Sequence, residues 1–175
     1  ALARGPLRRE VFKRPYLSTK SKVLYNDSLV HSKLVFNLHV WNILTKAERD
    51  RMAIEYMKGY RLATGYKAAN NPIQHVSDLK VLSQATRPTF DTMMSVQRLR
   101  YLPRLLAHAP TVLLRLLDET AHLENSWIQL INHDLRWLFE HTDPEARPGD
   151  QPTADAVVDA IRADPRRFRA LIRLS

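Results

Sequence analysis

The chain has 175 residues and a formal net charge of +9, and apolar residues make up 45% of it, which is enough to build the core of one domain. It contains no Cys, so disulfides and Cys-ligated zinc are excluded, while the compartment stays open and an intracellular location, nuclear or cytoplasmic, is favoured. The first residue is Ala and not Met, so we expect a piece of a longer chain or a processed one.

The charge is unevenly distributed along the chain. Residues 1–25 carry +6, residues 118–145 carry −6 and residues 161–175 carry +4. This pattern favours one side that faces a polyanion over a uniformly basic surface. The Arg-rich opening, 1–15, would also fit a mitochondrial presequence. We favour the end of a truncated helix, with a break at Gly5-Pro6 and a turn at 13–15.

A long central helix is predicted next. Between Pro15 and Gly59 there is neither Gly nor Pro, so a helix that begins after the Ser18 cap can continue to Leu44. At about 100° per residue its apolar side chains occupy two nearly opposite faces. One face holds Val23, Val30, Leu34, Leu38 and Trp41, and the other holds Tyr25, Leu29, Phe36, Val40 and Ile43. Such a helix needs neighbours on both sides.

The later helices are predicted from caps and breakers. Thr45 and Glu48 match a capping box, and Gly65 is placed to end the helix that follows it. Further helices are expected after Ser77, Thr89, Pro110 and Ser126, with a kink at Pro103 in the one that begins at Thr89. Residues 142–152 combine Pro, Asp, Glu and Gly without a period and predict a linker. Two short helices follow, parted at Asp164-Pro165.

These elements predict an all-α fold: an irregular multi-helix array around a long central helix, with a C-terminal pair of short helices. The expected divisions are a helical domain over 1–141, a linker over 142–152 and the short helices over 153–175. The longest apolar stretch, 34–44, is interrupted by three polar residues and is shorter than the ~20 residues of a bilayer span. We therefore expect no membrane partner.

Two groups of cations are candidate contacts for a polyanion. The first lies near the start of the chain and consists of Arg8, Arg9, Lys13, Arg14, Lys20 and Lys22. Lys and Arg that neutralise phosphates release counterions and bind without sequence preference, although a solubilising terminus explains the same cluster equally well. The second group is Arg100 and Arg104, which share a helix face. Arg98 falls on the apolar face, where a structural salt bridge is favoured over a phosphate contact.

No constellation in the sequence predicts catalysis. The seven His residues show no ligand spacing such as H-E-x-x-H, so no metal or other cofactor is expected. No G-x-S-x-G elbow or Gly-rich phosphate loop is present. The acids are scattered over presumed solvent faces and do not suggest a glycosidase-type pair.

One segment resembles a known family. KSKVLYNDSLVHSKLVFNLHVW, residues 20–41, is similar to the region that follows the polymerase palm in reverse transcriptases of non-LTR retrotransposons. The matching elements are Lys22, Leu24, Tyr25, Leu29, Val30, Ser32, Lys33, Leu34 and Trp41, followed by EYMKGYRLATGY. Farther on, VQRLRYLPRLLAHAP resembles the family's Arg-Leu-Arg-aromatic-Leu element, here 98–102. The resemblance covers about residues 7–109.

The resemblance implies a thumb and connection region that grips the backbone of the primer–template, an RNA or RNA–DNA duplex, beside a palm in the same polyprotein. The family's palm has an aromatic-x-Asp-Asp motif, and no Asp-Asp pair occurs here. The expected protein is therefore a non-catalytic, nucleic-acid-binding piece of an RNA-directed DNA polymerase. The alternative is a helical scaffold or interaction subunit of a larger ribonucleoprotein, anchored by its basic arm.

Overall fold

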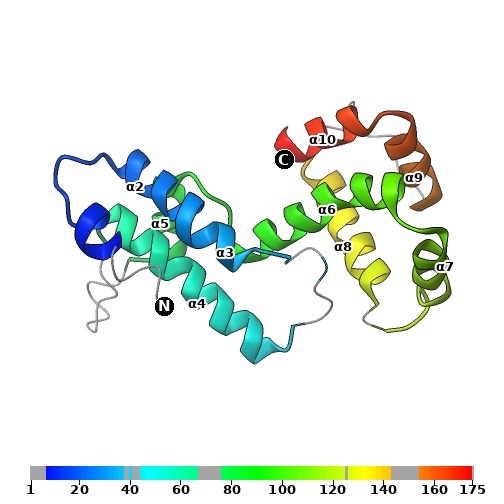
Figure 1. The fold of residues 1–175 in the computed structure, drawn as a ribbon, viewed down its shortest axis with the longest axis horizontal. Helices are drawn as coiled ribbons and strands as arrows, with labels where there is room; N and C mark the ends of the chain where they lie inside the picture. Colours follow the sequence, from blue (N-terminus) through cyan, green and yellow to red (C-terminus); the bar gives the residue numbers. More distant parts are fainter. Residues whose placement is uncertain are drawn as a thin grey trace. The chain divides into compact units, whose positions relative to one another are not determined.

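The computed structural model describes residues 7–37, 40, 44–66, 76–124, 126–142 and 154–174. The predicted all-α class is confirmed, because the described residues form helices and turns and include no strand. Two compact units divide the chain: unit 1 comprises 1–37 and 44–92, and unit 2 comprises 38–43 and 93–175. Figure 1 shows the helices of each unit.

Unit 1 is built from two helical segments and a third, shorter helix. The first segment opens with the π-helical turn η1 (Arg8–Phe12). After a turn, α2 (Thr19–Asn26), the π-helical turn η2 (Asp27–His31) and α3 (Ser32–Leu34) follow one another without a break. The second segment is α4 (Lys46–Thr64), and the third helix is α5 (Asp78–Ala85). Helix α2 packs against α4 and α5.

The helix ends of unit 1 follow the predicted local chemistry. The Ser18 hydroxyl accepts a hydrogen bond from the Ser21 amide, and Ser77 caps α5 in the same way. Both bonds of the Thr45–Glu48 capping box are present at the start of α4. Helix α4 ends at Gly65, whose φ of 83° lies in the left-handed region that Gly adopts without strain.

The predicted central helix is shorter than expected. It ends at Leu34 and not at Leu44, because Val35 leaves helical geometry and Asn37 has a φ of 57°. Asn is one of the few non-Gly residues that tolerate this conformation. Residues 38–39 and 41–43, which include the predicted face residue Trp41, lie outside the described residues. The longest described helices are α4 and α6, with 19 residues each.

Only one of the two predicted apolar faces of this helix is covered in unit 1. Val23 and Asn26 are buried against α4, whereas Tyr25 and Leu29 are 44% and 45% exposed. The prediction that both faces have neighbours is therefore wrong for the described residues. A pattern of apolar side chains marks a face that can be buried, but the covering partner must come from elsewhere in the fold.

Helix α4 approaches α2 closely at a glycine. A Cβ atom added to Gly59 would lie 2.2 Å from Oδ1 of Asn26 and 2.9 Å from its Cγ. Asn26 is only 2% exposed, so its side chain has little room to move away. The absence of a side chain at Gly59 allows the two helices to pack at this distance.

Unit 2 contains five helices over the described residues. They are α6 (Phe90–His108), which continues through Pro103 and whose first three residues are counted with unit 1, α7 (Thr111–Glu119), α8 (Trp127–Glu140), α9 (Ala154–Ala163) and α10 (Pro165–Leu174). The core combines side chains from α6, α8, α9 and α10: Leu99, Leu102, Ile131, Leu135, Leu138, Phe139, Val157, Ile161, Phe168 and Ile172. The predicted pair of short C-terminal helices is thus present.

The last two helices share this core with the helices that precede them. The predicted linker, 142–152, lies outside the described residues except for Thr142. Val157 and Phe168, which follow it, pack in the same cluster as Leu99 and Leu138, which precede it. The chain passes between the two units after residues 37, 43 and 92.

A buried ion pair lies in unit 2. Nε of Arg98 is 2.5 Å from Oδ2 of Asp134, and a second guanidinium nitrogen donates to Oδ1 at 2.9 Å. The Ser95 hydroxyl also donates to Oδ1, at 2.6 Å. Asp134 is fully buried and Arg98 is 6% exposed. The interpretation of Arg98 as a structural cation is therefore confirmed.

None of the described helices is both long enough and apolar enough to cross a bilayer.

Substituting Gly59 tests the contact between α2 and α4. We expect Gly59→Ala to destabilise the protein by about 1–3 kcal/mol because the new methyl group overlaps Asn26. Intrinsic helix propensity alone would give the opposite sign, about 1 kcal/mol of stabilisation. Urea denaturation measures the difference, and adding Asn26→Ala to Gly59→Ala should recover part of the loss. A stabilised Gly59→Ala protein would contradict the close approach.

Replacing the partners of the buried pair tests its role. Arg98→Leu or Asp134→Leu alone leaves one buried charge without its partner, and each should lower the free energy of unfolding by about 3–5 kcal/mol. The double variant removes both charges, so its loss should be smaller than that of either single variant. Chemical denaturation of the four proteins measures this coupling. Additive losses would show that the two side chains act independently.

Candidate nucleic-acid interface

The six cations predicted near the start of the chain all lie in unit 1. Arg8 and Arg9 belong to η1, Lys13 and Arg14 to the turn after it, and Lys20 and Lys22 to the first turns of α2. Five of the six are exposed and Lys22 is half-buried.

Local packing holds these cations at the surface. Phe12 is buried at the end of η1, and η1 packs against both α2 and α4. Ser18 then caps α2 and fixes the direction in which the helix leaves the turn. The charged side chains therefore project from a segment that is anchored by an aromatic side chain and a capped helix.

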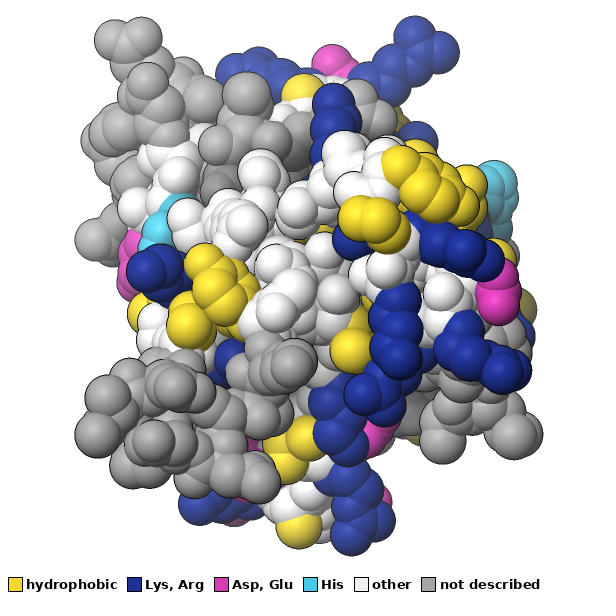
Figure 2. Space-filling model, turned by 90° about the vertical axis from the view of Figure 1, so that its left-hand side faces the viewer, with side chains coloured by type: hydrophobic (Ala, Val, Ile, Leu, Met, Phe, Trp, Pro, Cys, Tyr) yellow, Lys and Arg dark blue, Asp and Glu magenta, His cyan; other side chains and the backbone are white. Residues whose placement is uncertain are grey.

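Most of these cations have no acid beside them. Arg14 donates to Glu10 at 2.9 Å, and this bond raises the pKa of Arg14. Within the described part of the chain, none of the other five forms an ion pair. Figure 2 shows a face of the molecule on which Lys and Arg side chains form a band with few carboxylates among them. This surface can attract an external polyanion.

The two secondary candidates belong to the other unit. Arg100 and Arg104 are exposed on α6 in unit 2, whereas Arg98, two residues earlier, points into the core. The first six candidates thus share unit 1, whereas Arg100 and Arg104 belong to unit 2. Arg98 is a structural residue of the core.

A partly buried polar cluster in unit 1 was not predicted from the sequence. The carboxylate of Asp27 accepts the Tyr60 hydroxyl at 2.7 Å on one oxygen and Nε of Arg87 at 2.8 Å on the other. His31 lies one turn away, with Nδ1 3.4 Å from the Tyr60 hydroxyl oxygen. These four residues come from η2, α4 and the segment before α6, and their sequence separation left no motif to detect.

Burial dominates the electrostatics of this cluster. It lowers the pKa of His31 and raises the pKa of Tyr56 to about 12, and the pKa of Tyr60 is raised as well. Nε2 of His31 is buried without a hydrogen-bond partner among the described residues. Tyr60 is fully buried, and its hydrogen bond to Asp27 joins α4 to η2.

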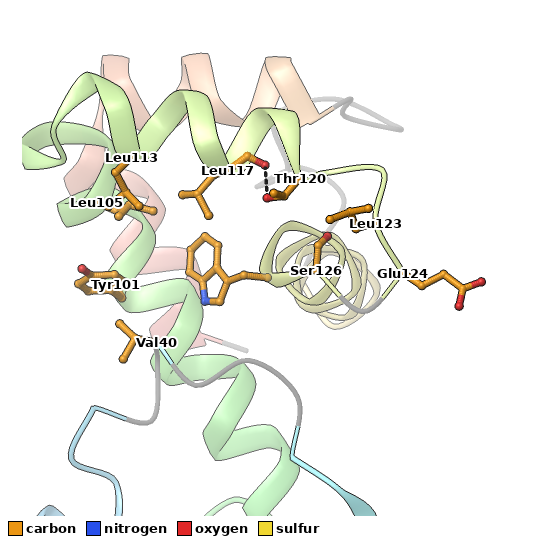
Figure 3. Close-up of a pocket in the computed structure, with 10 residues that line it drawn as sticks. Val40, Tyr101, Leu105, Leu113, Leu117, Thr120, Leu123, Glu124 and Ser126 are labelled. Carbon is orange, nitrogen blue, oxygen red and sulfur yellow. Dashed lines mark hydrogen bonds between the residues drawn. The ribbon is translucent and has the colours of Figure 1, made fainter.

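An apolar hollow of about 440 Å³ lies in unit 2. Leu105 and Tyr101 of α6 and Leu113 and Leu117 of α7 line it, while Glu124 points away from it (Figure 3). Its polar side chains serve the local backbone: the Thr120 hydroxyl donates to helix carbonyls, and Ser126 caps α8.

Metal ligands are likewise not gathered in the described residues. No group of three or more His, Asp or Glu side chains in that part of the chain could hold a metal ion. Comparisons with protein-family models, curated proteins and solved structures found no match to this chain.

Acidification tests the assignment of the buried cluster. Because burial lowers the folded-state pKa of His31 below its ordinary value of 6.5, the unfolded chain binds more protons in the window just below pH 6.5. Stability should therefore fall as the pH decreases through that window, and His31→Gln should weaken this dependence. Thermal melts between pH 7.5 and 5.5 measure it. Exposed His108 provides the control variant, and equal pH dependence in His31→Gln and wild type would contradict the assignment.

Proposed function

We propose that this protein is a non-catalytic, nucleic-acid-binding piece of a retroelement reverse transcriptase, which contacts the backbone of the primer–template duplex. The observation that carries the proposal is a group of six cations on η1, the following turn and α2: Arg8, Arg9, Lys13, Arg14, Lys20 and Lys22. Five of the six are exposed, and five of the six have no ion-pair partner among the described residues. We call this group the N-terminal basic surface. Phosphate contacts from such a surface position a duplex without reading its sequence.

The uncovered face of α2 and η2 supports a second part of the proposal, contact with the palm domain of the same polyprotein. Leu24, Tyr25 and Leu29 are 61%, 44% and 45% exposed, and Phe36 is exposed beyond them. Clusters of exposed apolar side chains mark surfaces that contact other proteins. A neighbouring domain placed here would cover the apolar face and leave the adjacent cations open to nucleic acid.

The same apolar face is the specific observation that favours the alternative function. A helical scaffold or interaction subunit of a ribonucleoprotein would use it to contact a partner protein and would use the N-terminal basic surface as an anchor. The reading frame upstream of Ala1 discriminates between the two functions. A palm with paired aspartates supports the reverse transcriptase, and a nearby start codon supports the scaffold.

Binding of the whole chain to a labelled, mixed-sequence RNA–DNA duplex tests the proposal. Affinity measured by fluorescence anisotropy should fall steeply as salt rises. Substituting Arg8, Arg9, Lys13 and Lys20 by Gln should reduce the slope of log K against log salt by about 3–4, since each phosphate contact contributes about 0.9. At ~100 mM salt we expect a loss of affinity of at least about tenfold.

The matched control removes four exposed cations from α4 and α5 of the same unit: Lys46, Arg51, Lys58 and Lys80, each replaced by Gln. It has the same net charge as the first variant and should bind within about threefold of wild type. Equal losses of affinity in the two variants would mean that binding depends on net charge alone and not on the N-terminal basic surface. Absence of binding at ~50 mM salt would disprove the proposed function.

A further inference from the structure

A second basic surface lies at the C-terminal end of unit 2. Arg162 near the end of α9 and Arg166, Arg167 and Arg169 of α10 are all exposed. We call these four residues the α10 arginine surface. They occur within eight residues, in a segment that the N-terminal basic surface does not include.

The opposite side of α10 fixes this surface to the fold. Phe168, Leu171 and Ile172 are 5%, 7% and 3% exposed, and Phe168 and Ile172 belong to the core cluster of unit 2. At about 100° per residue, Arg166 lies on the side of the helix away from Phe168, and Arg167 and Arg169 lie about 100° to either side of Phe168. The helix thus presents guanidinium groups outward from a buried apolar face.

The nearby carboxylates leave most of this charge uncompensated. Oδ1 of Asp164 accepts the backbone amides of Arg166 and Arg167, at 3.0 Å each, and so serves as the cap of α10. Asp159 is 3.9 Å from Arg162 in an exposed pair, a type of contact that contributes little. Among the described residues, no carboxylate lies within ion-pair distance of the side chains of Arg166, Arg167 or Arg169.

We infer that the α10 arginine surface is a second phosphate-binding site, which contacts the phosphate backbone of a nucleic-acid duplex. This inference rests on the proposed function. Arg is suited to phosphate because its planar guanidinium donates two parallel hydrogen bonds to the oxygens. The site can contact more than one phosphate, since its arginines lie at the start of α10 and near the end of α9.

The chemistry of the surface selects a duplex backbone over unpaired bases. Binding of single strands relies on aromatic side chains that stack on bases. Phe168, the aromatic residue of α10, is buried in the core, and the described part of α9 includes none. Arginine contacts to phosphates are therefore expected to act alone here, without base stacking and without sequence preference.

The same burial argues against a membrane surface as the partner. An amphipathic helix that binds lipid inserts its apolar face among the acyl chains, but the apolar face of α10 is already packed in unit 2. Anionic vesicles containing phosphatidylserine would meet only the arginines. They serve as a competing polyanion in the experiment.

The experiment compares two double variants of the whole chain, each with two exposed arginines replaced by Gln. Arg166→Gln with Arg169→Gln removes charge from the α10 arginine surface. Arg115→Gln with Arg136→Gln removes the same charge from α7 and α8 of the same unit. Circular dichroism melts confirm that both variants are folded, which exposed Gln residues should permit.

Anisotropy with a mixed-sequence RNA–DNA duplex of about 24 base pairs supplies the readout, over a salt series. The α10 variant should bind about fivefold more weakly near 100 mM salt, with a salt slope reduced by about 2, and the control should stay within about twofold of wild type. Single-stranded oligonucleotides of the same length should bind more weakly than the duplex and respond less to the α10 variant.

The outcomes separate this inference from the proposed function. If the duplex binds with salt dependence and loses affinity only in the N-terminal variant, the inference is overturned while the proposed function stands. If wild type does not bind the duplex, both are overturned. Stronger retention on phosphatidylserine vesicles than on the duplex, lost in the α10 variant, would assign the surface to lipid and overturn the inference.

Discussion

A guanidinium group can leave water only when a carboxylate or carbonyl takes the place of its hydration, and this requirement organises both units. In unit 2 the fully buried Asp134 holds Arg98 with two hydrogen bonds. In unit 1 Asp27 holds Arg87, and Arg61 pairs with Asp78 and donates to the carbonyl of Val76. Removing one partner of such a pair leaves an uncompensated charge in a medium of low dielectric constant.

This requirement also separates structural cations from functional candidates. Arg61, Arg87 and Arg98 have acids beside them and join different segments of the fold, so their charge is already compensated within the protein. Arg8, Lys20 and Arg169 are exposed without such partners in the described part of the chain. The proposed interfaces consist of cations of this second type, and their value to a polyanion depends on the rigid helices that present them.

Local chemistry made much of the fold predictable. The caps at Ser18, Thr45, Ser77 and Ser126 lie where the sequence placed them, because each hydroxyl satisfies a backbone amide of its own first turn. The buried Arg98 was also predictable, since a cation in the middle of an apolar stripe has few alternatives to an acid. Its partner Asp134, 36 positions away, was not, because long-range pairing follows from the packing of α6 on α8.

The central helix shows what neighbouring residues in the sequence cannot predict. Its two apolar faces are visible in the sequence, but no nearby residue indicates that the chain after Asn37 belongs to unit 2 and returns to unit 1 at residue 44. The Asp27–Tyr60–Arg87 cluster was missed for the same reason: its members meet only through the packing of η2 on α4. The sequence did offer one signal for the helix end, the residue type at position 37, because Asn often replaces Gly at a left-handed cap. In the structure Asn37 has a φ of 57°.

The two sides of α2 therefore have different roles, one in packing within unit 1 and one at an exposed surface. Its inner side is fixed by Val23 and Asn26 against Gly59 of α4, and this contact is complete within unit 1. Its outer side keeps Leu24 and Tyr25 exposed in the helix that also carries Lys20, and Leu29 of η2 is exposed beyond them. An apolar face that the unit does not cover favours a protein neighbour, whereas cations without acids favour a polyanion. A helix that presents both, side by side, suits a position between a protein domain and a nucleic-acid backbone.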